Sequence, residues 1–216
     1  MSATVHTYEA RFARQQPIRY ISHLDMTRAW ERMLRRARLP LAYSEGFNPR
    51  PRLAFAAPLP VGVLSLADIV EFVLSQPLEP ELVLAALQQQ AVPGLAIHQV
   101  QLVPPGRAAL QARMRQATYS VRLPAADLSG LQQAVARLIA ADHVPVRVMR
   151  QGQMREYDLR PLVLEASVQL DGDPSLQLRL RHDQQATGRP GDILQALGLD
   201  AADAEITRTG LILAEA

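Results

Sequence analysis

The residues that could do chemistry gather between positions 11 and 52. This segment has ten arginines against only three acidic residues, a net charge of +7. The next segment, 53–103, has four acidic residues and no arginine. Such a local excess of positive charge is typical of a site for a polyanion, and RNA is the first candidate. The alternative is a solvated face whose arginines pair with nearby acidic residues.

An arginine-rich helix is predicted to begin after Ser22. Asp25, three residues on, gives a capping-box-like start, and apolar residues at helical spacing form a buried stripe. Four arginines at i, i+4, i+7 and i+8 share another face of this helix: Arg28, Arg32, Arg35 and Arg36. Arg38 extends the cluster. We expect this face to bind backbone phosphates, unless the arginines pair with Asp25, Glu31 and the acidic residues of 68–81.

A structured loop is predicted over residues 43–52, because its composition favours turns. The residues that shape it are Gly46, Asn48, Pro49 and Pro51. Arg50, stiffened by a proline on each side, and Arg52 are candidate phosphate-binding residues. Tyr43 and Phe47 are candidates for stacking on bases. For Phe47 we favour the other interpretation, a core anchor that holds the loop rigid.

His23 is a weak candidate for acid–base chemistry. It lies in the first turn of the arginine-rich helix, where it could exchange a proton or donate a hydrogen bond to a phosphate. A single histidine beside a helix cap more often has a structural role. The five histidines show no metal-ligand spacing, so we expect no metal and no cofactor.

Composition excludes several classes of protein. The chain of 216 residues has no cysteine, which excludes disulfides, a cysteine nucleophile and a cysteine-ligated iron–sulfur cluster. All 23 basic residues are arginine, so a Schiff-base lysine and a P-loop are excluded too. No long apolar run and no signal-peptide pattern occur, which predicts a cytoplasmic protein without a membrane span.

The order of predicted elements indicates an α+β fold. Pro104-Pro105-Gly106 introduces a linker or exposed hairpin, 104–117, between domains 1–103 and 118–216. Apolar alternation predicts strands near residues 8–12, 68–74, 95–103, 119–123, 144–149, 162–170, 176–181 and 206–213, and a short extended pair within 41–60. Helices are expected after Ser22 and Pro80, over 128–139 and over 190–197. Each half reads β-α-β-β-α-β, which predicts tandem ferredoxin-like units with antiparallel sheets, although the second half has one strand too many.

Four short motifs resemble the bacterial radical-SAM-linked proteins, a family of unknown function. They stand here, in order, as Ser22-His23-Leu24-Asp25, Arg35-Arg36-Ala37-Arg38-Leu39-Pro40, Gly46-Phe47-Asn48-Pro49-Arg50-Pro51 and Pro58-Leu59-Pro60-Val61-Gly62. The resemblance implies partnership with a radical-SAM enzyme. Because that enzyme needs three cysteines for its cluster, it must be a separate chain. The resemblance assigns no role to any residue.

Three functions fit these observations. The first is an accessory subunit that presents tRNA or rRNA to a radical-SAM enzyme, which would modify it. The second is a metal-independent endoribonuclease, with His23 as acid or base and Arg28, Arg32 or Arg50 stabilising charge on the phosphate. The third is a docking subunit whose basic segment binds an acidic face of the partner. We favour the first.

Overall fold

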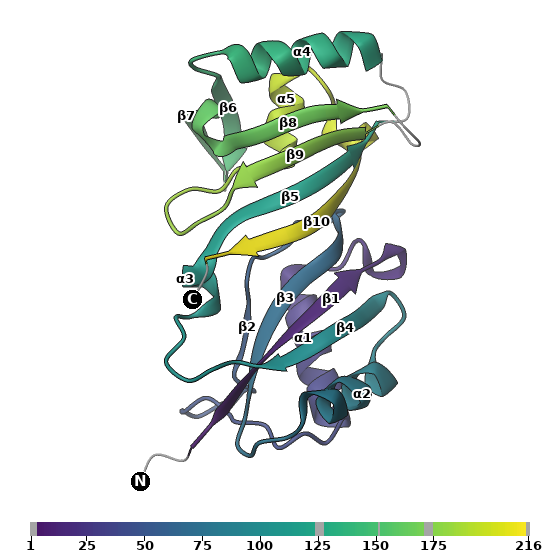
Figure 1. Ribbon diagram of the computed structural model, residues 1–216, viewed down its shortest axis with the longest axis vertical. Helices are drawn as coiled ribbons and strands as arrows, with labels where there is room; N and C mark the ends of the chain where they lie inside the picture. Colours follow the sequence, from purple (N-terminus) through teal and green to yellow (C-terminus); the bar gives the residue numbers. More distant parts are fainter. Residues whose placement is uncertain (1–3, 124–127, 151, 171–174, 215–216) are drawn as a thin grey trace. The chain divides into compact units, whose positions relative to one another are not determined.

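The computed structural model describes residues 4–123, 128–150, 152–170 and 175–214 (Figure 1). The chain has an α+β fold and divides into two compact units. The first contains residues 1–114 and 214–216, and the second contains residues 115–213. Among the residues described, no helix combines the length and the apolar character that crossing a bilayer requires.

The first unit follows the order β-α-β-β-α-β. Its strands, β1 (His6–Arg14), β2 (Leu53–Phe55), β3 (Leu64–Leu74) and β4 (Leu95–Leu102), lie in the order β4-β1-β3-β2, and neighbours are antiparallel. A 3₁₀ turn, Gln16–Ile18, follows β1. Two helices, α1 (His23–Arg36) and α2 (Pro80–Gln90), pack on one face of this sheet (Figure 1). The short pair expected within 41–60 is limited to β2 and isolated bridges such as Tyr43 with Pro51.

Aromatic side chains build the core of the first unit. Phe12 on β1 meets Trp30 on α1 edge-on, with ring centroids 5.1 Å apart. Tyr8 stacks on Phe72 of β3, and its hydroxyl donates to the carbonyl oxygen of Leu78 at 2.7 Å. Because successive side chains of a strand point to opposite faces, one face of the sheet is apolar, and the apolar side of α1 that includes Trp30 packs on it. Most polar residues of α1 lie on its other sides.

The opposite face of this sheet carries a buried charge cluster. Glu9 and Glu71 lie opposite each other on β1 and β3. Arg113 bridges them, because its Nη2 donates to Glu9 Oε2 at 2.8 Å and to Glu71 Oε1 at 2.7 Å. The side chains of Glu9 and Arg113 are buried, whereas that of Glu71 is partly exposed. A guanidinium between two carboxylates offsets their mutual repulsion and ties residue 113 to the sheet.

The segment 104–117, expected to be a linker or an exposed hairpin, begins with a loop. This loop is followed by the short helix α3 (Leu110–Arg113) and the start of β5 (Met114–Arg122). Leu110, Arg113 and Met114 are buried, and Gln111 donates to the carbonyl oxygen of Phe55 at 3.2 Å. The prolines and glycine indicated a break, but the buried carboxylates that bind Arg113 lie far away in the sequence.

The second unit repeats the element order around an inserted hairpin. Its main strands are β5, β8 (Val163–Gln169), β9 (Ser175–Arg181) and β10 (Glu205–Leu213), in the order β10-β5-β9-β8. Arg122 pairs with Glu205, and Thr118 with Thr209, so β5 and β10 run in opposite directions. The other neighbours are also antiparallel. The remaining elements are α4 (Leu128–Ala140), α5 (Pro190–Ala196) and the 3₁₀ turns Arg160–Leu162 and Ala201–Asp203.

The inserted hairpin explains the surplus strand. β6 (Pro145–Arg150) was predicted, whereas its partner β7 (Gln153–Asp158) was not. β7 reads Gln-Met-Arg-Glu-Tyr-Asp and is largely exposed, so it lacks the alternation that marks a strand buried on one face. It is stabilised by pairing with β6, including a 2.8 Å contact between Arg147 and Glu156.

Candidate nucleic-acid interface

Ser22 and Asp25 fix the start of the arginine-rich helix. The Ser22 hydroxyl accepts from the backbone N–H of Asp25 at 3.1 Å and donates to Asp25 Oδ2 at 2.7 Å. The predicted capping start is confirmed. The hydrogen bond from Ser22 lowers the pKa of Asp25 below its usual range, with Arg28 contributing in the same direction. Two residues of the first motif thus satisfy orphan groups at the helix start.

The arginine face of α1 is half paired and half open. Arg28 pairs with Asp25 at 3.3 Å, and Arg35 pairs with Glu31 at 3.1 Å. Arg32 and Arg36 are exposed, with no hydrogen bond or ion pair from either side chain to any residue that the structure describes. Pairing within the helix therefore accounts for two of the four arginines. The pairing with acidic residues of 68–81, considered as an alternative, does not occur among the described residues.

Arg38 adds a positive charge at the C-terminal end of the same helix. It follows the C-cap residue Ala37, and its φ of 54° lies in the left-handed region. Its N–H donates to the carbonyl oxygen of Arg35 at 3.0 Å. Glycine is the usual residue at such a position, because a side chain there costs about 1 kcal/mol. An exposed arginine occupies this position in spite of that cost.

Residues 43–52 form a loop closed at its base, as expected. The N–H of Ser44 donates to the carbonyl oxygen of Arg50 at 2.8 Å, and the N–H of Arg50 donates to the Ser44 hydroxyl at 3.1 Å. Tyr43 and Pro51 form a bridge next to this closure, and Pro51 is buried. Gly46 has a φ of 117°, which favours glycine. The sequence motif around Gly46 therefore builds a defined loop rather than a flexible tether.

The loop presents aromatic and cationic side chains to solvent. Phe47 is fully exposed, so its interpretation as a core anchor is wrong. The closure by Ser44 and the burial of Pro51 hold the loop without it. Tyr43, Arg50 and Arg52 are also exposed, and neither arginine side chain has an ion pair with the described residues. Only residues 39–42 separate this loop from Arg38, so one stretch of chain carries both groups.

Two other arginines of the basic segment have structural roles. Arg14 is buried, and its guanidinium donates to the carbonyl oxygens of Ile18, Arg19 and Ile21 at 2.6–3.0 Å. The Arg19 side chain donates to the carbonyl oxygen of Gly62 at 2.7 Å. The net charge of the segment thus overstates the charge available to a ligand.

His23 lies beside a very small cavity. Its ring meets Phe55 edge-on at 5.1 Å, and burial followed by the charge of Arg14 lowers its pKa. Arg14 and Asp68 line the same cavity, which measures about 10 Å³. A space of about that size admits one water molecule at most. A substrate would therefore have to reach His23 from the solvent side of its ring.

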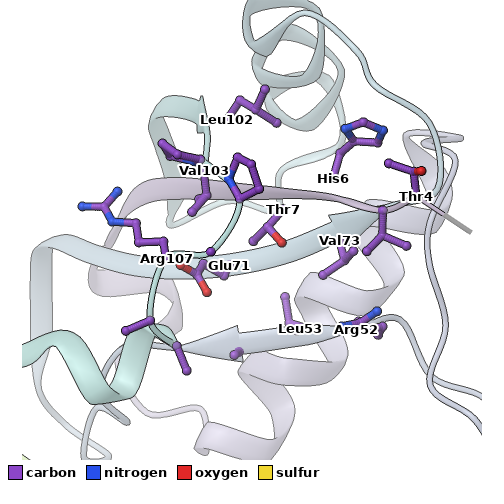
Figure 2. Close-up of a pocket in the computed structure, with 17 residues that line it drawn as sticks. Thr4, His6, Thr7, Arg52, Leu53, Glu71, Val73, Leu102, Val103 and Arg107 are labelled. Atoms are coloured by element: carbon purple, nitrogen blue, oxygen red, sulfur yellow. The ribbon is translucent and has the colours of Figure 1, made fainter. Parts of the chain in front are cut away.

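A larger pocket, which the sequence did not indicate, lies on the sheet face opposite the helices. It measures about 670 Å³ and is lined by the start of β1, by residues 52–54, by β3 and by the segment 102–109 (Figure 2). Glu71 and Arg107 lie in it, and Arg52 brings the end of the 43–52 loop to it. Of the features that line it, the sequence predicted only the chain break at Pro104-Pro105-Gly106.

Glu71 is held in an unusual environment in this pocket. Burial raises its pKa, the charge of Arg113 opposes that rise, and Glu9 adds to it. Within the described residues, only its Oε1 has a hydrogen-bond partner. Arg107 acts on Glu71 electrostatically, and its buried Nε has no partner there. The pocket thus offers an acceptor and a donor that the described protein leaves unused.

The second unit has a separate cavity of about 570 Å³. It is lined by β7 and residues 185–192, and it contains Tyr157, whose hydroxyl contacts Asp192 Oδ2 at 2.5 Å. Across the described part of the chain, histidine and acidic side chains do not gather in threes as a metal ion would need.

Comparison with known proteins identifies a family. A crystal structure of an unknown protein from Galdieria sulphuraria aligns with 98% of this chain and 100% of its own, at 12% identity. Its TM-score of 0.31 is too low to support an argument. No curated protein matches the chain. Residues 7–190 match the family described as "Uncharacterized protein conserved in bacteria" (DUF2344), and the chain belongs to this family.

Proposed function

We propose that the chain is an RNA-binding accessory subunit, for tRNA or rRNA, of a separate radical-SAM enzyme that modifies the RNA. The observation that supports this most is the exposure of Arg32 and Arg36 on α1 and of Phe47 and Arg50 on the 43–52 loop. Unpaired guanidinium groups bind phosphates in a fork geometry, and an exposed aromatic ring stacks on bases. We call these four residues, with Arg38 and Tyr43, the arginine–aromatic surface.

The arrangement of strands supports the same proposal by analogy. Both units follow β-α-β-β-α-β, with sheet orders β4-β1-β3-β2 and β10-β5-β9-β8. We propose that each is a ferredoxin-like unit, the second with the β6–β7 insertion. Sheets of this kind serve as RNA platforms in other proteins. Because one fold can serve many functions, the proposal rests on the exposed residues of α1 and of the 43–52 loop.

The radical-SAM partnership rests on the motif resemblance. Purification of a tagged chain from its native cells under anaerobic conditions is expected to recover a protein with a three-cysteine cluster motif, identified by mass spectrometry. Recovery of the chain with RNA but without any such protein, in repeated purifications, would contradict the partnership and leave RNA binding standing.

RNA binding is tested by comparing matched arginine pairs. Affinity for total tRNA is measured by fluorescence anisotropy for the wild type, for Arg32→Ala/Arg36→Ala and for Arg50→Ala. The control is Arg137→Ala/Arg155→Ala, two exposed arginines of the second unit that have no hydrogen bond or ion pair with described residues. We expect the first two variants to bind at least about fivefold more weakly, because each lost phosphate contact removes favourable energy.

The control separates a specific surface from general charge. If the Arg32→Ala/Arg36→Ala variant and the control lose the same affinity for tRNA, only net charge matters, and the proposed surface would be wrong. No tRNA binding by the wild type at low salt would overturn RNA binding altogether. The arginines would then fit the docking alternative, with an acidic face of a protein as partner.

A further inference from the structure

We propose that the 670 Å³ pocket of the first unit holds a guanosine 5′-phosphate unit, either free or as one nucleotide of bound RNA. Glu71 would accept from the guanine edge, Arg107 would donate to it, and Arg52 would bind the phosphate. The inference deepens the proposed function and rests on it, because Arg52 joins this pocket to the 43–52 loop.

Glu71 favours guanine among the four bases. An ionised carboxylate accepts hydrogen bonds and cannot donate them. Guanine is the base with two neighbouring donors on its pairing edge, N1–H and the N2 amino group. Adenine and cytosine place a donor beside an acceptor, and uracil offers one donor. Oε1 of Glu71 already accepts from Arg113, but a carboxylate has about four acceptor positions, so both oxygens can serve a base.

Arg107 and Arg52 supply the rest of the pattern. Guanine O6 lies next to N1–H and needs a donor. The guanidinium of Arg107, whose Nε has no partner among the described residues, would provide it by turning towards Glu71. In Figure 2, Glu71 lies between Arg107 on one side of the pocket and Arg52 on the other. A ligand with its base at Glu71 and Arg107 can therefore extend its phosphate towards Arg52. Arg52 is exposed and has no ion pair with described residues.

The size and walls of the pocket suit such a ligand. Pockets for small molecules measure about 300–1,000 Å³ and combine apolar walls with few polar groups. Leu53, Val73, Val103 and Pro104 provide apolar surface around Glu71. A flat base packed against these side chains would be removed from water, which strengthens its hydrogen bonds to the charged groups.

The test uses short RNA and free nucleotide with the full chain. Fluorescence anisotropy compares the labelled pentanucleotides UUGUU and UUAUU, and calorimetry compares guanosine and adenosine 5′-monophosphate. We expect the wild type to prefer guanine by at least about tenfold in both assays, since a mismatched edge sets a base acceptor against the carboxylate and leaves Glu71 Oε2 without a donor. Glu71→Gln, which keeps the shape but removes one acceptor, should abolish the preference.

Two further variants protect the test from a folding artefact. Arg107→Met removes a guanidinium that makes no hydrogen bond or ion pair with the described residues, together with its charge beside Glu71. It should weaken guanine binding with little change in melting temperature. Glu79→Gln removes an exposed carboxylate elsewhere in the first unit and should change nothing. Guanosine monophosphate selectivity without oligonucleotide binding would identify a free-nucleotide site and overturn RNA binding. Oligonucleotide binding with equal affinity for both bases, unaffected by Arg107→Met, would overturn the guanine pocket alone.

Discussion

Arg38 combines a backbone cost with an exposed charge. Replacing it with glycine should raise the free energy of unfolding by about 1 kcal/mol, because glycine adopts the left-handed conformation without a side-chain penalty. The same change should weaken tRNA binding about twofold to fivefold if the arginine contacts a phosphate. Urea denaturation and anisotropy measure the two effects. A variant that is more stable and binds equally well would show that Arg38 has no part in the surface.

Phe47 gives a second prediction for a single residue. Phe47→Ala should weaken tRNA binding between about fivefold and a hundredfold, since stacking contributes roughly 1–3 kcal/mol per base. The melting temperature should stay the same, because the ring is fully exposed. Phe47→Trp, which keeps a flat aromatic surface, is the matched control and should bind as well as the wild type. Loss of thermal stability in Phe47→Ala would contradict the structure.

The residues of the site were predictable only where local spacing decides their position. The helical spacing of Arg32 and Arg36 placed them on one face, and the spacing of Ser22 and Asp25 predicted the cap. Whether Phe47 is buried depends on the closure of its loop by Ser44, which no local pattern specifies. The environment of Glu71 could not be predicted either, because it depends on Arg113, 42 residues away in the sequence.

At the scale of elements, the cap of α1 positions the arginine face. Ser22→Ala should lower the free energy of unfolding by about 1 kcal/mol, because it leaves the N–H of Asp25 without its acceptor. Chemical denaturation followed by circular dichroism measures the change. Ser22→Thr keeps the hydroxyl and should recover most of the loss. A Ser22→Ala protein as stable as the wild type would show that the first motif serves another purpose.

Helices and strands could be predicted from the sequence to the extent that residues close in the sequence determine them. β1 and β3 were predictable because one face packs on α1 and α2, which imposes alternation on the sequence. β7 and α3 were missed for opposite reasons. β7 is mostly exposed and needs only its partner strand, whereas α3 is a single turn held by the distant Glu9 and Glu71.

For the whole molecule, we expect the free energy of unfolding to depend on pH through the titration of His182. Burial, with the charges of Arg208 and Arg189, lowers the pKa of His182 to about 4, although Asp183 acts in the opposite direction. Between about pH 6.5 and 4 the unfolded chain binds a proton that the folded chain does not, so stability falls as pH falls. The loss should total about 1–3 kcal/mol, after allowance for the partly exposed ring.

His182→Gln separates this effect from the titration of carboxylates. Urea denaturation of both proteins at pH 7.5 and 5 gives the difference in stability between the two pH values. The variant should lose less stability than the wild type on acidification, because it lacks the titrating ring. Identical losses in the two proteins would show that His182 remains neutral in the unfolded chain or is protonated equally in both states.

RNA binding by the whole chain should depend strongly on salt concentration, because the proposed contacts are to phosphates. Affinity of the wild type for total tRNA should be measured by anisotropy from 50 to 300 mM salt. The logarithm of the association constant should fall linearly with the logarithm of salt concentration, with a slope of about −2 to −4 for three to five phosphate contacts. The Arg32→Ala/Arg36→Ala variant should reduce that slope by about 1.5. Absence of binding at 50 mM salt, or a slope that the variant leaves unchanged, would contradict the account.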